Sequence, residues 1–265
     1  MTGLAAALGR AQKTGSTLLL PYLTAGLPSA DASLALFEAM SAAGADGFEI
    51  GIPYTDPLMD GPVIQRAGLE ALNAGMTLDG GFALSKRVVT STAKPAILMT
   101  YVNPVLRMGL SAFCDRAAAA GVDAVIFVDV PVDEAEPFSE AARASGVGLV
   151  LFASPTITDA RLEAVIAAEP TFIYGIADLG VTGERSTAST HVGHLSSRVR
   201  SLSDIPLVLG VGISGPEQAA AAAPHADGII VGTAVVRRVL EAANVDEAGR
   251  ATAQLIEEIR AAIDG

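Results

Sequence analysis

Eight short apolar runs, distributed along the whole chain, most constrain what this sequence can fold into. Each is long enough for a strand, and they span residues 18–25, 47–53, 96–102, 124–131, 148–154, 171–177, 206–213 and 228–231. Ala-rich segments with helical periodicity lie between them, including residues 30–43, 111–120, 134–145 and 159–168. The runs are continuously apolar, as expected for parallel strands that are covered on both faces. Eight such units that close on themselves predict an α/β fold of the (β/α)8 TIM-barrel type.

An open doubly wound sheet would show a similar alternation, but it usually carries a G-x-G-x-x-G turn after its first strand. Residues 24–28 (TAGLP) do not fit that turn. No break in composition and no long linker divides the chain, so we expect one domain over residues 1–265. Two additions to the barrel are expected. They are an N-terminal helix around residues 4–11 and extra helix in the link between strands two and three, whose helical segments are about 62–74 and 78–92.

The composition excludes some classes of partner. A formal charge of −12 and a pI near 4.6, with no basic cluster, argue against nucleic acid. Cys114 is the only cysteine, so no intrachain disulfide forms, and it is expected to be a small packed residue of a helix. The chain shows neither a secretory start nor a membrane-length apolar stretch. We therefore expect a cytoplasmic protein with no membrane association.

An ionisable residue, Glu49, interrupts the second apolar run (residues 47–53, GFEIGIP). Carboxylates are seldom buried in a strand without a partner or a function. Because side chains alternate along a strand, Glu49 shares a face with Gly51, whose missing side chain is expected to leave room for a ligand. Asp60 follows on the adjoining loop, and two acids at one site suggest proton transfer. The alternative is that backbone or Arg satisfies Glu49, and that Asp56 and Asp60 simply form turns.

Three glycine-rich turns follow the expected strands six, seven and eight, at residues 180–183 (GVTG), 209–215 (LGVGISG) and 230–234 (IVGTA). Glycine lets backbone N–H groups approach phosphate oxygens, Ser214 and Thr233 add hydroxyl donors, and a helix N-terminus favours the dianion. Tight turns need glycine anyway, so the predicted phosphate site depends on all three turns together. The Gly-, Ser- and Thr-rich segment 178–190 is expected to be a loop, either a lid or an ordinary surface loop.

Two common routes to carbon–carbon chemistry are poorly supported. The only lysines, Lys13, Lys86 and Lys94, lie outside the expected strands, which argues against a Schiff base. His191 and His194 could share a helix face as metal ligands, but no strand-end carboxylate completes the set, so a solvated helix start is favoured. The remaining chemistry is proton transfer by carboxylates on a substrate that supplies its own electron sink.

Residues 48–62 (FEIGIPYTDPLMDGP) and 99–104 (MTYVNP), with the GVTG and GVGIS turns, resemble the tryptophan synthase alpha chain family over nearly the full length. In that family the alpha chain cleaves indole-3-glycerol phosphate to indole and glyceraldehyde 3-phosphate, a retro-aldol lyase reaction in tryptophan biosynthesis that needs no cofactor. The beta chain, which carries pyridoxal phosphate, joins indole to serine. The resemblance implies an alpha2beta2 heterotetramer with that beta chain. Asp56, Pro57 and Asn103 lie on loops that resemble the family's partner-facing surface.

The resemblance also implies the roles of the site residues. Glu49 would protonate indole C3 and then accept a proton from the glycerol hydroxyl, and Asp60 would accept a hydrogen bond from the indole N–H. Tyr22 and Met99 would sandwich the ring, with plain core packing as the alternative for Met99 and Tyr174. The residues expected to bind the substrate are Tyr22, Met99, Tyr101, Asp129, Tyr174, Thr182, Gly183, Gly212, Ser214, Gly232 and Thr233.

The chain departs from the family pattern at two places. Asp178 and Leu179 stand where members often carry Arg-Ala, and Val211 replaces the commoner Phe, which allows a wider indole pocket. Neither change touches the carboxylate pair. Three other functions remain open: a stand-alone indole-releasing lyase that is independent of a beta chain, a non-catalytic subunit, and a sugar-phosphate isomerase or a barrel that forms indole-glycerol phosphate.

Overall fold

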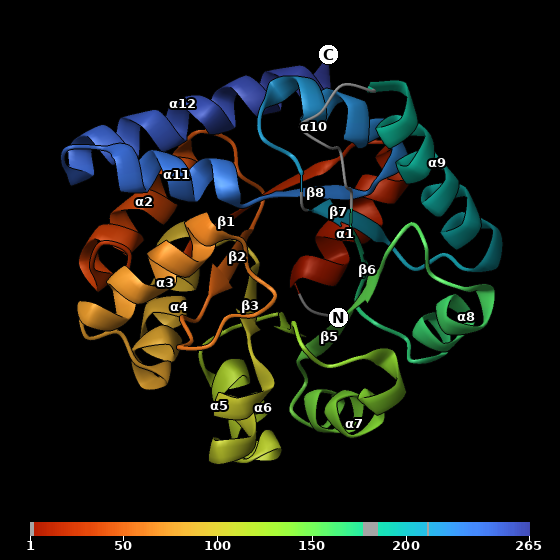
Figure 1. Ribbon diagram of the computed structural model, residues 1–265, viewed down its shortest axis with the longest axis horizontal. Coiled ribbons are helices and arrows are strands. Elements are labelled where there is room, and N and C mark those ends of the chain that lie inside the picture. The colour runs from red at the N-terminus through yellow and green to blue at the C-terminus, as the bar shows by residue number, and fades with distance from the viewer. Residues whose placement is uncertain (1–2, 177–184, 211) are drawn as a thin grey trace.

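All eight expected strands are present and close into one parallel barrel in the computed structural model, which describes residues 3–176, 185–210 and 212–265, the side chains of 185–191 excepted (Figure 1). The strands pair in chain order, and β8 returns to β1. They are β1 (Leu18–Thr24), β2 (Phe48–Gly51), β3 (Ala96–Thr100), β4 (Ala124–Phe127), β5 (Gly148–Ala153), β6 (Ile173–Ile176), β7 (Leu207–Gly210) and β8 (Gly228–Val231). The predicted TIM barrel is confirmed.

Most helices surround the barrel on the outside, and α1 lies across its N-terminal end, where the N–H of Leu4 bonds to Asp123 (Figure 1). The helices are α1 (Gly3–Thr14), α2 (Ala30–Ala42), α3 (Pro62–Asn73), α4 (Leu78–Thr92), α5 (Val102–Met108), α6 (Leu110–Ala119), α7 (Glu136–Ala144), α8 (Asp159–Ala167), α9 (Arg185–Leu202), α10 (Pro216–Ala222), α11 (Thr233–Glu241) and α12 (Val245–Asp264), with 3-10 turns η1 (Val132–Glu134) and η2 (Ala223–His225). The N-terminal helix α1 and the two helices α3 and α4 between β2 and β3 match the expected additions.

Two predictions about the helices need correction. The loop expected over 178–190 is wrong from Arg185 onward, where α9 begins. Residues 186–190 are mostly Ser and Thr, which predict a loop, but Val192, Leu195 and Val199 farther along α9 are buried at helical spacing and anchor the helix. The predicted helix 111–120 is present as α6, whereas α5 was not predicted; Gly109, with φ of 95°, separates the two helices.

Alternation along the strands decides which side chains line the barrel interior. Tyr22 on β1 lies opposite Glu49 on β2, and Glu49 lies opposite Ile97 on β3, so these three side chains share the inner face. The neighbouring positions face the helices: Phe48, for example, packs edge-on against Phe37 of α2, with ring centroids 5.1 Å apart. Burial on both faces explains why the runs are continuously apolar.

The N-terminal ends of the strands carry a repeated hydrogen-bond pattern. Asp46 accepts the backbone N–H of Leu19 at 2.9 Å, and Asp227 accepts that of Leu207 at 2.8 Å. Asp123 accepts two, from Ala96 of β3 at 3.0 Å and from the start of α1 at 3.1 Å. Each aspartate precedes an even-numbered strand and pairs an N–H group at the start of the odd-numbered strand before it.

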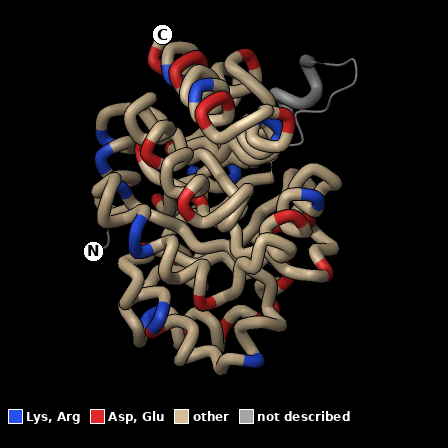
Figure 2. The backbone as a smooth tube through the Cα atoms, turned by 90° about the vertical axis from the view of Figure 1, so that its left-hand side faces the viewer, with Lys and Arg blue, Asp and Glu red and all other residues tan. Residues whose placement is uncertain are grey.

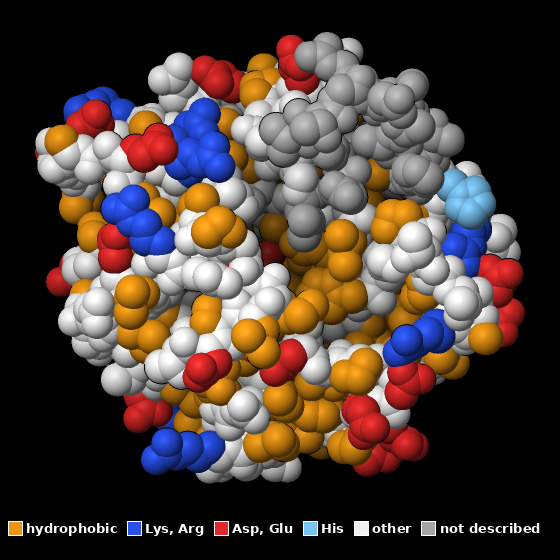
Figure 3. All heavy atoms as spheres, in the orientation of Figure 1, with side chains coloured by type: hydrophobic (Ala, Val, Ile, Leu, Met, Phe, Trp, Pro, Cys, Tyr) orange, Lys and Arg blue, Asp and Glu red, His pale blue; other side chains and the backbone are white. Residues whose placement is uncertain are grey.

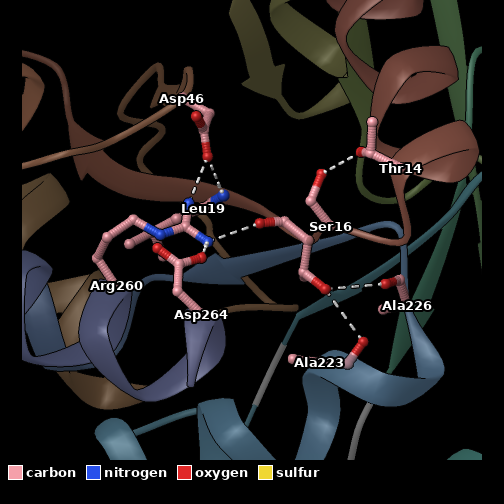
Figure 4. A network of polar contacts seen from close by, with 9 residues as sticks. Thr14, Ser16, Leu19, Asp46, Ala223, Ala226, Arg260 and Asp264 are labelled. Atoms are coloured by element: carbon pink, nitrogen blue, oxygen red, sulfur yellow. Dashed lines mark hydrogen bonds and ion pairs between the residues drawn. The ribbon is translucent and has the colours of Figure 1, made fainter.

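Helix α12 lies on the outside of the barrel and packs against α2, α10 and α11. Its Arg260 binds the Asp46 carboxylate at 2.7 Å and the backbone carbonyl of Thr17 at 2.9 Å (Figure 4). The Thr17 hydroxyl donates to the carbonyl of Ala223 at 3.1 Å. This network ties the last helix to the entry of β1 and to the turn before β8.

The single thiol is buried as predicted. In the view of Figure 2, Lys and Arg positions lie among Asp and Glu positions, and several Lys and Arg positions lie along its left-hand side. Cys114 is fully buried in α6, where burial and the neighbouring Asp115 raise the pKa of its thiol to about 11. Among the helices of the described ranges, none is both long and apolar enough to span a bilayer.

Candidate active site

Glu49 is almost completely buried in β2, with 3% of its surface exposed. Within the described part of the chain its Oε2 atom has no hydrogen-bond partner, so neither backbone nor arginine pairs this oxygen. Burial, and then the negative charge of Asp60, raise the pKa of Glu49 to about 8. The carboxyl is therefore mostly protonated at neutral pH. A buried acid in that state is a proton donor.

Asp60 lies half-buried on the loop between β2 and α3, as the sequence indicated. Burial raises the pKa of its carboxyl, and a hydrogen bond with the Tyr101 hydroxyl opposes that rise. The same hydroxyl accepts the backbone N–H of Met59 at 3.1 Å. Tyr101 stacks on Tyr54, with ring centroids 5.2 Å apart, so the acidic loop is fastened to the end of β3 next to it.

Two buried tyrosines, Tyr22 of β1 and Tyr174 of β6, flank Glu49. Burial is the main cause that raises the pKa of each phenol, and the charge on Glu49 contributes to both. Each phenol lies over a glycine: a Cβ at position 51 would overlap the Tyr22 hydroxyl, and a Cβ at position 210 would overlap that of Tyr174. The expectation that Gly51 leaves room for a ligand is therefore wrong, because Tyr22 occupies that space.

The remaining predicted ring contact, Met99, lies on β3 opposite Gly51 and is partly exposed. Its side chain packs against the core, which keeps the packing alternative open. The face of the molecule drawn in Figure 3 is hollowed near its middle, and hydrophobic side chains line this hollow, with acidic atoms at its floor. A flat aromatic group with one polar edge suits such surroundings.

At the expected phosphate end, β7 and β8 are neighbours in the barrel. Gly232 caps α11 without a side-chain hydrogen bond, and Thr233 is exposed at the first position of the helix. Gly212 has φ of 85°, and Ser214 beside it is exposed. A Cβ on Gly232 would lie 3.6 Å from Cβ of Tyr22, so this end adjoins the pocket around Glu49. The first N–H groups of a helix have no partner within the helix, so those of α11 can receive an anion.

Other predicted residues are placed differently or not at all. Asp129 is exposed and accepts the backbone N–H of Val102 at 2.8 Å at the start of α5, so its substrate contact stays a prediction. Thr182, Gly183 and the departures Asp178, Leu179 and Val211 lie outside the described residues.

No metal centre emerges in the described ranges, since no three His, Cys, Asp or Glu side chains there come together to hold an ion. His194 is exposed on α9, and the side chain of His191 lies outside the described set.

The sequence prediction missed two residues that shape the site. Thr24 is buried on β1, and its hydroxyl is hydrogen-bonded to that of Tyr22 at 3.2 Å. Gly210 ends β7 and leaves the space that Tyr174 fills. Alternation carried the signal for Thr24, which lies two positions after Tyr22 and so shares its face. Only the pairing of β6 with β7 brings Gly210 to Tyr174.

Comparisons with known proteins agree on one family. Residues 8–264 match the family model described as Tryptophan synthase alpha chain. A tryptophan synthase alpha chain of Phenylobacterium zucineum is 42% identical over 89% of this chain and 85% of its own length. One from Synechococcus elongatus is 39% identical over 100% of this chain and 98% of its own.

Solved structures give the same result. The crystal structure of tryptophan synthase subunit alpha from Legionella pneumophila superimposes with a TM-score of 0.88 at 31% identity, covering 100% of this chain and 99% of that one. A tryptophan synthase of M. tuberculosis, in its aminoacrylate-bound form, gives 0.87 at 32% identity over 99% and 100%. With its barrel, its buried acid and relatives of this similarity over nearly every residue, this chain belongs to the tryptophan synthase alpha chain family.

Proposed function

We propose that this protein is the alpha subunit of tryptophan synthase and cleaves indole-3-glycerol phosphate to indole and glyceraldehyde 3-phosphate. The observation that carries the proposal is the carboxyl of Glu49, which is 3% exposed and has an oxygen with no partner among the described residues. Its pKa is raised to about 8, and Asp60 contributes to that rise. A protonated acid beside a second carboxyl suits a reaction in which a carbon atom must first gain a proton.

In the proposed reaction Glu49 donates its proton to C3 of the indole ring. The ring nitrogen then carries positive charge, and Asp60 stabilises it by accepting a hydrogen bond from the N–H. The carboxylate of Glu49 next removes the proton of the hydroxyl on the adjacent glycerol carbon. As that oxygen forms a carbonyl, the bond to C3 breaks and its electrons return to the ring. Glu49 ends protonated, so the two products leave with no net proton change.

The substrate phosphate would lie at the end of the barrel formed by β7 and β8. Supporting this placement are the open N-terminus of α11 at Gly232 and Thr233, and the exposed turn of Gly212 and Ser214. Main-chain N–H groups and hydroxyls can hold a dianion without lysine. Tyr22 separates this end from Glu49 and lies within 3.6 Å of the Cβ position of Gly232, so one substrate can reach both.

The proposal includes a beta-chain partner in an alpha2beta2 heterotetramer, with pyridoxal phosphate in the beta chain and no cofactor in this one. A surface on the loop between β2 and α3 and on α5 supports it. There Leu58, Met59 and Leu106 are 89%, 66% and 58% exposed, an unusual degree for large apolar side chains. Asn103 joins α5 to this loop, because its side-chain amide donates a hydrogen bond to the Tyr54 hydroxyl at 3.0 Å. We also propose that residues 1–265 fold as one domain and act in the cytoplasm.

Indole release by the purified chain, with and without a beta chain, tests the function. We expect slow release by the chain alone and much faster release with the partner. Glu49→Gln keeps the size and polarity of the side chain but has no acidic proton, so turnover should fall about 10²- to 10⁴-fold while substrate binding is largely kept. Glu70→Gln, on the exposed face of α3, is the matched control. A Glu49→Gln enzyme with most of its turnover would contradict the assigned role.

The same assay separates the alternative. High activity that no beta chain changes would identify a stand-alone lyase, whereas the exposed apolar side chains of Leu58 and Met59 favour the partnered enzyme. Replacing both with Ser should then reduce the stimulation by the beta chain and leave the basal rate of the chain nearly unchanged.

A further inference from the structure

The hydroxyl of Tyr22 has a partner that the reaction does not explain. It is hydrogen-bonded to the hydroxyl of Thr24 at 3.2 Å. Both residues are buried, with exposures of 6% and 1%, and they point to the same inner face of β1. Two buried hydroxyls that bond to each other satisfy one another, and loss of this bond would leave a buried polar group without a partner.

This pair lies beside the buried acid. Tyr22 is directly opposite Glu49 in the register of β1 and β2, and Thr24 is opposite Gly51. The phenol hydroxyl occupies the space above Gly51, which lies two residues after Glu49 on the same face of β2. Among the described residues, Oε2 of Glu49 has no hydrogen bond. The Tyr22 hydroxyl and this carboxyl oxygen thus belong to the same inner face, yet the hydroxyl is hydrogen-bonded to Thr24.

A phenol that donated a hydrogen bond to Glu49 would favour the ionised form of its carboxyl, which has no proton to give. A hydrogen bond donated to the ionised carboxylate stabilises the charged form and lowers its pKa. Hydrogen bonds to charged groups are worth about 1.5 to 3 kcal/mol, so such a bond would lower the pKa of Glu49 by about one unit or more.

We propose that Thr24 is a positioning residue that acts through Tyr22: it holds the phenol hydroxyl away from Glu49 and so keeps Glu49 a proton donor. The proposal rests on the catalytic role proposed for Glu49. Among the described residues, the other titratable groups that interact electrostatically with Tyr22 or Glu49 are Asp60 on the following loop, Tyr101 at the end of β3 and Tyr174 on β6.

Titration of Glu49 in the isolated chain, followed by the infrared band of its protonated carboxyl, tests the proposal without any turnover. The band is assigned by its loss in Glu49→Gln. In Thr24→Val the hydroxyl of Tyr22 is released, and the midpoint should move down by about one pH unit. Thr24→Ser keeps a hydroxyl at this position and should leave the midpoint in place.

The second mutation of a cycle decides the mechanism. In Tyr22→Phe there is no phenol to release, so adding Thr24→Val should no longer move the midpoint. An unmoved midpoint in Thr24→Val, or an equal shift in the Phe background, would overturn the proposal. Thr24→Ala gives the same comparison if the valine variant does not fold.

The rate profile distinguishes this proposal from the role of Glu49 itself. Because the protonated acid is the active form, kcat/KM should fall as pH rises past the Glu49 pKa, and Thr24→Val should move that fall to lower pH together with the band. A shifted band with an unshifted rate profile would support the positioning by Thr24 and refute catalysis by Glu49.

Discussion

The carboxylates at the two ends of the barrel differ in their hydrogen-bond partners. At the N-terminal end Asp46, Asp123 and Asp227 accept backbone N–H groups at 2.8 to 3.1 Å. At the site, Glu49 has an oxygen without a partner in the part of the chain that the structure describes, and burial raises the pKa of both Glu49 and Asp60. One end thus uses acids to satisfy the backbone, and the other keeps acids poorly satisfied.

The difference shows where this fold places stability and where it places reactivity. A buried carboxylate that accepts backbone N–H groups replaces lost water with fixed donors and fastens one element to another. A buried carboxyl without such donors favours its neutral form, which costs folding free energy whenever the solution favours the charged form. That cost is the physical origin of a proton donor at neutral pH.

The largest effect that tests the comparison is expected for Asp123→Ala. It removes the acceptor of two buried N–H groups, those of Leu4 and Ala96, and should lower the free energy of unfolding by about 2 to 5 kcal/mol. Indole release per folded molecule should stay unchanged, because the site lies at the other end. Asp79→Ala, at an exposed ion pair with Arg116, is the matched control and should cost less than about 1 kcal/mol.

The sequence foretold much of this architecture, since continuous apolar runs between helical segments are typical of parallel strands with two buried faces. Several strands were predicted too long, because buried apolar residues continue past the last residue that pairs with a neighbouring strand. Ile52 still donates its N–H to the carbonyl of Met99 at 2.9 Å, but Pro53 has no N–H and the strand has ended. Helix α5 went unseen because Pro104 in its first turn and Gly109 at its end look like a loop in isolation.

The site was predictable to a different degree. A glutamate in an apolar strand with a nearby aspartate can be recognised from the sequence alone, and in the structure the charge of Asp60 contributes to the raised pKa of Glu49. The space above Gly51 was not predictable, because only the register of β1 against β2 brings Tyr22 there. Contacts between strands depend on tertiary pairing, which the spacing within one run does not encode.

A smaller effect should appear as a pH dependence of stability. The pKa of Glu49 is raised in the folded protein from 4.5 to about 8, so between these values the folded state binds more protons than the unfolded state. Stability is therefore lost as pH rises through this window, by up to about 1.4 kcal/mol per pH unit. Denaturant unfolding of the wild type and of Glu49→Gln from pH 5 to 9 measures it.

The free energy of unfolding of Glu49→Gln should rise relative to that of the wild type as the pH rises, because Gln has no charge to bury. Parallel curves for the two proteins would show that Glu49 is solvated or paired when ionised, and the contrast between the barrel ends would then fail for this residue.

The smallest effect is expected at a third kind of carboxylate, one exposed on a helix. Glu70 pairs with Arg66 one turn away on α3 at 2.8 Å, with side chains that are 42% and 61% exposed. Glu70→Gln should change the free energy of unfolding by less than about 0.5 kcal/mol, and salt should abolish the difference. A cost above 1 kcal/mol would mean that burial is a poor guide to what these acids contribute.

The hydrogen bonds of Arg260 to Thr17 and Asp46 also matter for folding during synthesis. Arg260 and Thr17 are 243 residues apart in the sequence, and β1 can pair with β8, its second neighbour, only after β8 has been made. During synthesis the first strand emerges early but obtains these contacts only after nearly everything downstream has left the ribosome. A nascent chain therefore exposes the unpaired edge of an incomplete sheet for most of its translation time. We expect chaperones to bind the chain at this edge.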